Sequence, residues 1–258
     1  MTPRQAFRNL GVHPELLSGE EKEFLDENGY LPLEGVLSDG EVKCIRKRLD
    51  KLAELEGENA GSELHQEEGT VRLANLIDKG AIFEKFIATP RVLAGITHVL
   101  GTNIQLSSLS SRSALPNGQG QQRLHCDWGE GVKHGEYMVC NSTWLIDDYT
   151  KENGGTRIVP GSHRSGQVPS DVTEDLMADH PDQINLTGRA GTVIIFNSHL
   201  WHGGAVNRSD EQRRGVLSYW VRRGYSFQND HRKLLSDATK KRLSEESLVL
   251  AEAGEPNS

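Results

Sequence analysis

The chain has 258 residues, and its 29 lysines and arginines against 37 aspartates and glutamates give a formal net charge of −8. At this length folding buries roughly 70 to 75% of the surface that an unfolded chain exposes, so one domain can build a core without disulfides or a structural metal. An acidic chain lacks the clustered basic residues that phosphate contacts need, which argues against nucleic acid as a partner. Three scattered cysteines exclude a disulfide framework, and no apolar run approaches the ~20 residues of a membrane span. We therefore expect a cytoplasmic protein with no membrane partner.

The first part of the chain, residues 1–101, has the pattern of a helical front. Capping boxes at residues 18–21 and 38–41 predict two helices, the second of them amphipathic. A threonine followed by proline begins a third predicted helix over residues 89–101. The polar, acidic stretch at residues 57–70 is typical of a mobile surface loop.

From about residue 102 the pattern changes to short runs that are rich in β-branched and aromatic residues and bounded by turn residues. These runs are NIQLSSLSSR, QQRLHCDW, YMVCNSTWLIDD, TRIVP, QINLT, GTVIIFN and RGVLSYWVRR. Such runs without helices between them predict an antiparallel sandwich or barrel over residues 102–224. Residues 225–258 predict a C-terminal helix and a tail, so the expectation is a single α+β domain over residues 1–258 with a mainly β core.

The pattern that indicates chemistry is His125-Cys126-Asp127. On a strand, residues at i and i+2 project from the same face and can hold one ion between them. The pattern is weak alone, because about one such match is expected by chance in a histidine-rich chain. A second match, at residues 180–182, contains a central proline and lies in a polar stretch, so it is assigned to a loop.

His202 strengthens the first pattern, because it follows a buried-strand run, GTVIIFNSHLW, that ends at a turn. Two histidines and one carboxylate on one face leave coordination positions open, as a non-haem Fe(II) oxygenase requires. A closed structural zinc site would need a fourth ligand, usually cysteine. Cys126 does not fit that role, since its side chain is expected on the opposite face of the strand from its neighbours.

Two adjacent arginines, Arg213 and Arg214, begin the last predicted strand. A guanidinium group at the base of a barrel pocket suits the distal carboxylate of a bound diacid, because it offers a planar bidentate fork. Neighbouring strand residues face opposite sides, so one arginine is expected to point inward and the other to solvent.

Together these motifs resemble the phytanoyl-CoA dioxygenase family of Fe(II)- and 2-oxoglutarate-dependent oxygenases. The resemblance rests on the His125–Asp127 motif, on ENGGTRIVPGSHR at residues 152–164, and on HGGAVN from His202 with Arg213 after it. It extends from about residue 24 to about residue 223. It implies a double-stranded β-helix (jelly-roll, cupin-like) core with flanking helices.

The resemblance also implies roles for individual residues. The iron ligands and catalytic residues would be His125, Asp127 and His202. Arg213 corresponds to the arginine that pairs with the distal carboxylate of 2-oxoglutarate; its distance from His202 favours it, although alignment from the far end of the strand favours Arg214. Two further cosubstrate positions would be Thr156 and Gln122. The sequence departs from the family at Cys126, where glutamine is common.

The implied cofactors are Fe(II), 2-oxoglutarate and O₂, with ascorbate as an optional reductant. The implied reaction oxidises a C–H bond of a small-molecule metabolite and releases succinate and CO₂, with hydroxylation, desaturation and cyclisation all open. Asp127 argues against halogenation, because halogenating relatives replace this carboxylate. Two alternatives remain: a non-catalytic jelly-roll binding protein, and a metal-dependent hydrolase with the same ligands. Substrate specificity is expected in the loops at residues 57–72 and 129–137, and a homodimer is left open.

Overall fold

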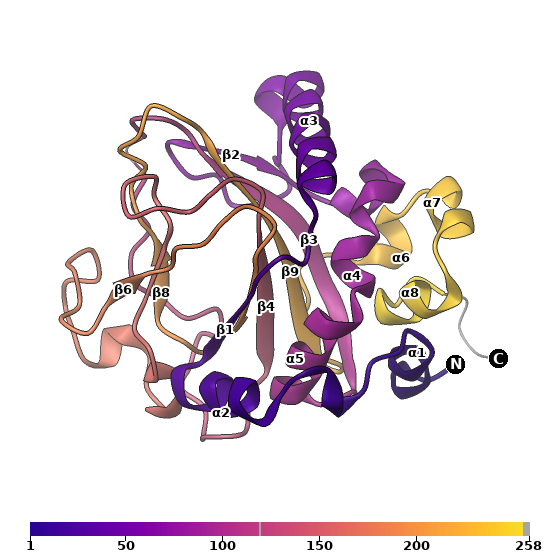
Figure 1. The fold of residues 1–258 in the computed structure, drawn as a ribbon, viewed down its shortest axis with the longest axis horizontal. Coiled ribbons are helices and arrows are strands. Elements are labelled where there is room, and N and C mark those ends of the chain that lie inside the picture. Colours follow the sequence, from indigo (N-terminus) through magenta and orange to yellow (C-terminus); the bar gives the residue numbers. More distant parts are fainter. Residues whose placement is uncertain (119, 255–258) are drawn as a thin grey trace.

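The computed structural model describes residues 1–118 and 120–254, which form two facing antiparallel sheets with helices on one side (Figure 1). The larger sheet has the order β1 (Tyr30–Leu33), β7 (Val193–Asn197), β4 (Val139–Leu145), β9 (Arg213–Arg222), β3 (Ile104–Ala114) and β2 (Thr70–Leu73). The smaller sheet has the order β6 (Ile184–Asn185), β5 (Thr156–Ile158) and β8 (His202–Gly204). The two sheets do not share strands, so they form an open sandwich and not a closed barrel.

The larger sheet has two chemically different faces, as the alternation of β9 shows. Val216 and Trp220 on this strand are fully buried and belong to the main hydrophobic core. Arg213, Leu217 and Tyr219 alternate with them and line a cavity on the other face. One face of the sheet therefore supports the helices, while the other is free to carry polar chemistry.

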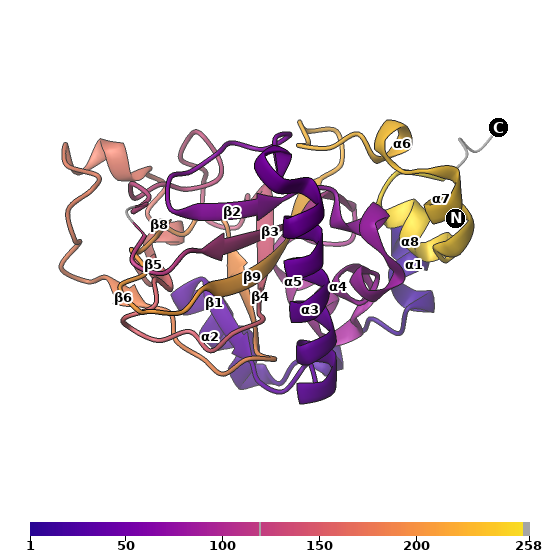
Figure 2. The same cartoon turned by 90° about the horizontal axis from the view of Figure 1, so that it is seen from above.

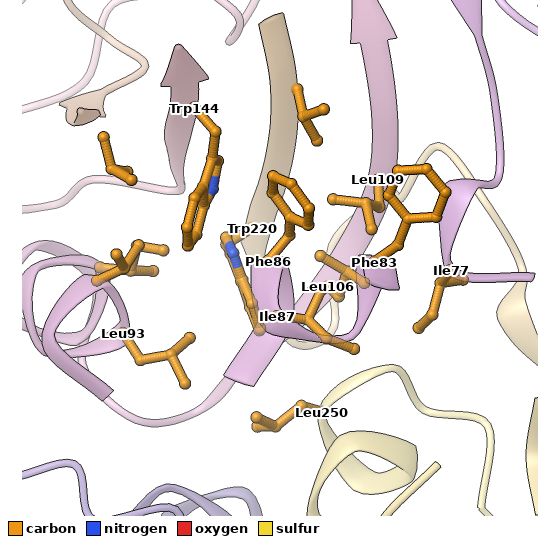
Figure 3. Packing of buried hydrophobic residues seen from close by; sticks show 14 of the residues in the cluster. Ile77, Phe83, Phe86, Ile87, Leu93, Leu106, Leu109, Trp144, Trp220 and Leu250 are labelled. Atoms are coloured by element: carbon orange, nitrogen blue, oxygen red, sulfur yellow. The ribbon is translucent and has the colours of Figure 1, made fainter. Parts of the chain in front are cut away.

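Two tryptophans anchor the core on the helical side of the sheet (Figure 3). The indole nitrogens of Trp144 and Trp220 donate to the hydroxyls of Ser142 and Ser218 at 2.9 and 3.1 Å, and the two hydroxyls lie 2.5 Å apart. Phe86 packs edge-on against Trp144 with ring centroids 4.6 Å apart. Because the buried indole N–H groups are satisfied, both large rings contribute their apolar area without an unpaired donor.

Most of the helices cover the side of the larger sheet that faces away from the smaller one, while α2 (Gly19–Asn28) lies beside β1 at one end of the sandwich (Figure 1, Figure 2). In chain order they are α1 (Pro3–Asn9), α2 (Gly19–Asn28), α3 (Asp39–Glu56), α4 (Lys85–Ala88), α5 (Pro90–Leu100), α6 (His231–Leu234), α7 (Asp237–Arg242) and α8 (Glu245–Leu250). The predicted capping boxes that begin α2 and α3 are confirmed. Thr89 precedes α5 as expected, but its hydroxyl donates to the Lys85 carbonyl and does not cap the helix.

Other elements differ from the expectation. The helical front contains β1 and β2, which lie at the two edges of the larger sheet. The C-terminal segment forms three short helices instead of one, and α8 packs against α1. The run QQRLHCDW is not a regular strand, since it makes only an isolated bridge at His125. In the part of the chain that the structure describes, no helix combines the length and apolar character that crossing a membrane would require.

Candidate metal centre

The three predicted ligands, His125, Asp127 and His202, come together between the two sheets. Each offers one ligand atom, and these atoms all lie within 4.8 Å of one another. The Nε2 atoms of His125 and His202 lie 3.8 and 3.6 Å from Oδ1 of Asp127. Over residues 1–118 and 120–254 no other group of three or more histidine, cysteine or carboxylate side chains has such geometry.

Backbone hydrogen bonds fix the two histidines opposite each other. The N–H of His125 donates to the carbonyl of His202 and the reverse bond is also present, both at 2.8 Å. The N–H of Asp127 donates to the Ser198 carbonyl at 2.9 Å. A full strand was expected at this position, but a single antiparallel bridge holds the two histidines opposite each other. The chain on either side of His125 is irregular.

The tautomers of both rings follow from their neighbours. Nδ1 of His125 lies 2.9 Å from the Arg123 carbonyl, and Nδ1 of His202 lies 2.8 Å from the Leu200 carbonyl. A carbonyl only accepts, so each Nδ1 carries a proton, and in the neutral ring each Nε2 is left with the lone pair. Two imidazole nitrogens and a carboxylate oxygen are a donor set that fits a divalent transition metal.

Asn141 on β4 orients the carboxylate. Its Nδ2 donates to Oδ2 of Asp127 at 2.7 Å, so Oδ1 is the oxygen that faces the histidines. This residue was not predicted from the sequence. The available signal was an amide side chain within the otherwise buried run of β4.

Electrostatics set the protonation states that a cation needs. Burial raises the pKa of Asp127, but the two histidines and the hydrogen bond from Ser198 together outweigh burial and hold that pKa below its usual value. Burial together with His202 lowers the pKa of His125. For His202, burial acts to lower the pKa, but the charge of Asp127 and the hydrogen bonds to Asp127 and to the Leu200 carbonyl together outweigh burial and raise the pKa. An ionised Asp127 and a neutral His125 are therefore favoured near neutral pH.

The three side chains open into a cavity of about 260 Å³ between the sheets. Both sheets contribute to its wall, mostly through polar residues: Ser108, Ser110, Asn141, Thr143, Thr156 and Tyr219, with Gly204, Phe196 and Leu217 as members without a polar side chain. A polar wall around a partly buried ligand set suits a small hydrophilic guest.

Arg213 lies in the wall of the same cavity and is 3% exposed. Its guanidinium carbon lies 4.3 Å from the ring centre of Tyr149, and its Nε donates to the Asn153 carbonyl at 3.2 Å. The Tyr149 hydroxyl fits against the strand because residue 215 is glycine, where a Cβ would come within 2.2 Å of that oxygen. These contacts hold a buried cation in place without neutralising it.

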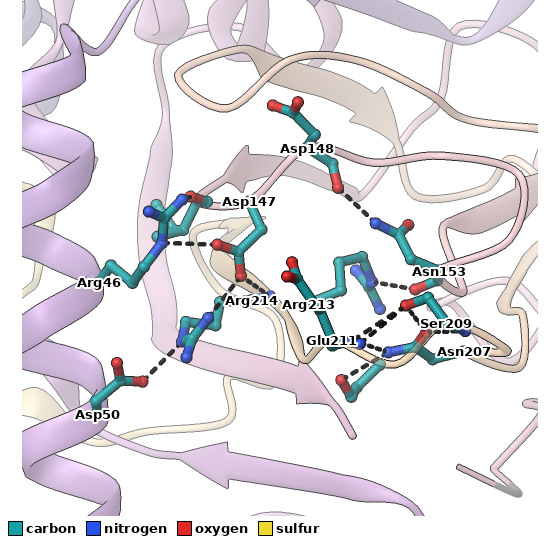
Figure 4. Close-up of polar contacts among 12 residues, drawn as sticks. Arg46, Asp50, Asp147, Asp148, Asn153, Asn207, Ser209, Glu211, Arg213 and Arg214 are labelled. Carbon is teal, nitrogen blue, oxygen red and sulfur yellow. Dashed lines mark hydrogen bonds and ion pairs between the residues drawn. The ribbon is translucent and has the colours of Figure 1, made fainter. Parts of the chain in front are cut away.

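Arg214 points to the opposite face, as the strand alternation predicts (Figure 4). Its Nε lies 2.7 Å from a carboxylate oxygen of Asp50 on α3, and its Nη1 lies 2.9 Å from one of Asp147. Arg46 pairs with the other oxygen of Asp147 at 2.7 Å. Arg214 therefore ties the sheet to α3 and lies outside the cavity.

A second charged group in the cavity, formed by Glu67, Arg72 and Arg112, was not predicted. The carboxylate of Glu67 accepts from Nη1 of Arg72 at 3.0 Å and from Nε of Arg112 at 2.7 Å. Glu67 belongs to the loop that was expected to be a mobile surface segment, yet its side chain is only 10% exposed. The missed signal was Arg112 itself, a charged residue inside the buried run of β3.

Gln122 and Thr156 both line the cavity. The Gln122 amide is engaged at both ends, since Nε2 donates to Glu67 at 2.8 Å and Oε1 accepts from the Gly204 N–H at 2.8 Å. Thr156 begins β5 and pairs with Gly204 of β8. Both residues thus lie beside the strand that carries His202.

The remaining sequence candidates lie outside the cavity. Cys126 donates its thiol to the Trp128 carbonyl at 2.9 Å and is not among the clustered ligands. The second H-x-D match, at residues 180–182, forms a turn in which the Asp182 side chain is 82% exposed.

Two solved structures share the fold. HygX from Streptomyces hygroscopicus, crystallised with nickel and 2-oxoglutarate, aligns over 82% of this chain and 89% of its own, with a TM-score of 0.66 at 18% identity. SnoK, a non-haem α-ketoglutarate-dependent carbocyclase from nogalamycin biosynthesis, aligns over 90% and 93%, with a TM-score of 0.66 at 22% identity. At these identities the likeness shows the jelly-roll fold, as predicted.

A jelly roll with an open two-histidine, one-carboxylate group between its sheets defines the class of non-haem Fe(II)- and 2-oxoglutarate-dependent dioxygenases. Residues 25–215 match the phytanoyl-CoA dioxygenase (PhyH) family, and the chain belongs to it. Among curated relatives, ectoine dioxygenase from Bordetella bronchiseptica is 24% identical over 80% of this chain and 76% of its own. L-proline trans-4-hydroxylase from Streptomyces griseoviridis is 26% identical over 74% and 81%. The predicted family and enzyme class are confirmed.

Proposed function

We propose that this dioxygenase oxidises a C–H bond of a small-molecule metabolite while 2-oxoglutarate and O₂ are converted to succinate and CO₂. The observation that carries the proposal is the presence of the three-ligand group and the buried, uncompensated Arg213 in one cavity. His125, Asp127 and His202 would hold Fe(II), and Arg213 would bind the distal carboxylate of 2-oxoglutarate. Bound iron supplies the redox chemistry with O₂.

The residues of the chain contribute positioning and protection from water. Asn141 holds Asp127 so that one oxygen faces the metal position. Tyr149 and Asn153 fix the plane of the Arg213 guanidinium, which sets where a diacid can lie. The two sheets flank the cavity, and their residues would limit the contact of bound reactants with bulk solvent.

The hydrolase alternative has little support from the cavity. A hydrolase needs a general base or acid close to the metal. Burial raises the pKa of Glu67, but Arg112 and Arg72 outweigh burial and hold that pKa below its usual value. Its carboxylate is also occupied by three hydrogen-bond donors, so Glu67 is a poor base.

The test is succinate formation from 2-oxoglutarate by the purified protein with Fe(II), ascorbate and O₂, over a panel of small amino acids and hydroxy acids. We expect succinate to require Fe(II) and O₂ and to be lost in Asp127→Ala and His202→Ala, both of which should remain folded by circular dichroism. Turnover that is supported equally by Zn(II), or no succinate under any condition, would contradict the proposal.

A further inference from the structure

The Glu67, Arg72 and Arg112 group lies in the same cavity as the metal-ligand group. The side chains of Glu67, Arg72 and Arg112 are 10%, 16% and 9% exposed. Buried ion pairs usually balance their charges, because an uncompensated buried charge is costly. Here two guanidinium groups share one carboxylate.

The charge of the whole cavity leaves the same surplus. Its lining holds three arginines, Arg72, Arg112 and Arg213, against two carboxylates, Glu67 and Asp127. A divalent cation and the dianionic 2-oxoglutarate would cancel each other. One positive charge therefore remains uncompensated in the cavity that holds the metal and 2-oxoglutarate. A bound monoanion would balance this charge.

Hydrogen-bonding capacity is also unused at this position. Among the residues that the structure describes, Nη2 of Arg112 and Nε of Arg72 are buried without a hydrogen-bond partner. The Arg112 guanidinium lies over Gly204, where a Cβ would come within 2.8 Å of Nη2. The glycine thus leaves room for the arginine beside the strand that carries His202.

We infer that Arg72 and Arg112 form a substrate subsite for a carboxylate, so that the substrate is a small carboxylic acid. This inference rests on the proposed function, because it assigns Arg213 and the metal to the cosubstrate. A guanidinium pair recognises a carboxylate through directed, charge-assisted hydrogen bonds. A carboxylate matches a surplus of one charge better than a phosphate monoester, which carries nearly two at neutral pH.

The rest of the cavity fits such a substrate. Ser108, Ser110, Thr143 and Gln228 supply hydroxyl and amide groups along its wall. Its volume of about 260 Å³ has to hold 2-oxoglutarate as well. Drug-sized ligands occupy pockets of roughly 300–1,000 Å³, so the space left suits a molecule of amino-acid size.

The experiment uses the full chain saturated with Ni(II) and 2-oxoglutarate, which permits binding without turnover. Calorimetry measures the affinity for L-proline, L-pipecolate and a series of 2-hydroxy acids, each paired with its primary amide. We expect at least one acid to bind, and its amide to bind at least about tenfold more weakly. The first titration tests binding of Ni(II) and 2-oxoglutarate before any acid is added. Failure to bind either of them would count against the proposed function and can be distinguished from failure of the acid to bind.

Variants then separate the substrate subsite from the cosubstrate site. Arg72→Gln and Arg112→Gln should weaken acid binding at least about tenfold, while Arg213→Gln should weaken 2-oxoglutarate binding instead. Glu67→Gln removes the carboxylate that Arg72 and Arg112 share, so the affinity for the acid should rise. If the three side chains had only a structural role, the affinity for the acid would fall in all these variants. Arg214→Gln, on the outer face, is the matched arginine control and should change neither affinity.

Four results would overturn the inference. If amides bind as well as their acids, or if no acid of the panel binds the loaded protein, the substrate is not recognised through a carboxylate. Loss of 2-oxoglutarate affinity in Arg112→Gln and Arg72→Gln as large as that in Arg213→Gln would assign the pair to the cosubstrate. Weaker acid binding in Glu67→Gln, with the thermal unfolding midpoint unchanged, would contradict the charge argument.

Discussion

Asn141 donates a hydrogen bond of 2.7 Å to Oδ2 of Asp127, while Oδ1 of the same carboxylate faces both histidine rings. The amide comes from β4 and the carboxylate from an irregular segment, so the contact joins the rigid sheet to a part of the chain with little secondary structure of its own. The larger sheet thereby sets the orientation of a proposed ligand that it does not carry.

Replacement of Asn141 should therefore weaken metal binding. Hydrogen-bond partners of metal ligands typically change metal affinity by about 10- to 100-fold when they are removed, and we expect a loss in this range for Asn141→Ala. Asn141→Asp should lose more, because a second carboxylate beside Asp127 repels it and raises its pKa. Calorimetric titration with Ni(II) measures both. Affinities within about twofold of wild type would show that Asp127 needs no such support.

Metal affinity should also depend on pH through His202. Asp127 raises the pKa of His202 above its ordinary value of 6.5, and a protonated imidazole cannot bind a cation. Affinity should be constant above that raised pKa and fall about tenfold per pH unit below it, because one proton competes. His125 should not contribute to the first part of this fall, since its own pKa is lowered. Ni(II) titrations from pH 8 downward would check the slope, and a slope of two protons from the start would be inconsistent with it.

Acid should destabilise the protein partly through His231. This side chain is 2% exposed, and within the described residues neither ring nitrogen has a partner. Burial lowers its pKa from 6.5 to about 4, so the unfolded state binds the proton more tightly. The stability is fully present above pH 6.5 and is lost as the pH falls toward 4, at about 1.4 kcal/mol per pH unit for one proton.

His231→Phe should flatten this part of the stability curve and raise stability by about 1 kcal/mol at neutral pH, because two buried polar atoms are removed. Urea unfolding at several pH values measures both effects. His163→Phe is a useful comparison, since its pKa is also lowered by burial but its Nε2 lies 3.1 Å from the Asp26 carbonyl. That variant should flatten the curve without the gain at neutral pH.

Arg157 should be important for the smaller sheet. It is 1% exposed, and its guanidinium donates to the carbonyls of Gln122, Leu176 and Ala178 at 2.8, 3.0 and 3.0 Å. Lysine cannot make this planar set of bonds, so Arg157→Lys should cost about 3 kcal/mol and expose residues 165–183 to proteases. The exposed Arg189→Lys is the control. Equal proteolysis of the two variants would show that Arg157 does not anchor this segment.

The parts of the fold that local sequence determines were predicted correctly. The capping boxes at Ser18 and Ser38 satisfy the first N–H groups of their helices within four residues, so the pattern is complete in the sequence. The β core was predictable because its strands alternate or run continuously in β-branched and aromatic residues. The short strands β1, β2 and β8 were not, because their pairing depends on partners far away in the chain.

The candidate site also contains some features that local sequence predicts and others that depend on distant parts of the chain. The clustering of His125, Asp127 and His202 could be predicted because their residue types and order form a motif, and strand alternation explains why Arg213 faces the cavity while Arg214 does not. Glu67 and Asn141 could not be named, since each acts through a tertiary contact with a residue in another segment. Glu67 in particular belongs to a polar loop whose composition gives no sign that one carboxylate is buried.

The most direct test of the central claim, that the clustered ligands and Arg213 act on one cosubstrate, is the affinity for 2-oxoglutarate with and without metal. We predict that 2-oxoglutarate binds at least about tenfold more tightly to the Ni(II)-loaded protein than to the metal-free protein, and that Arg213→Gln loses this affinity while Arg214→Gln keeps it. Binding that is independent of metal, or equal affinities in the two arginine variants, would contradict the account.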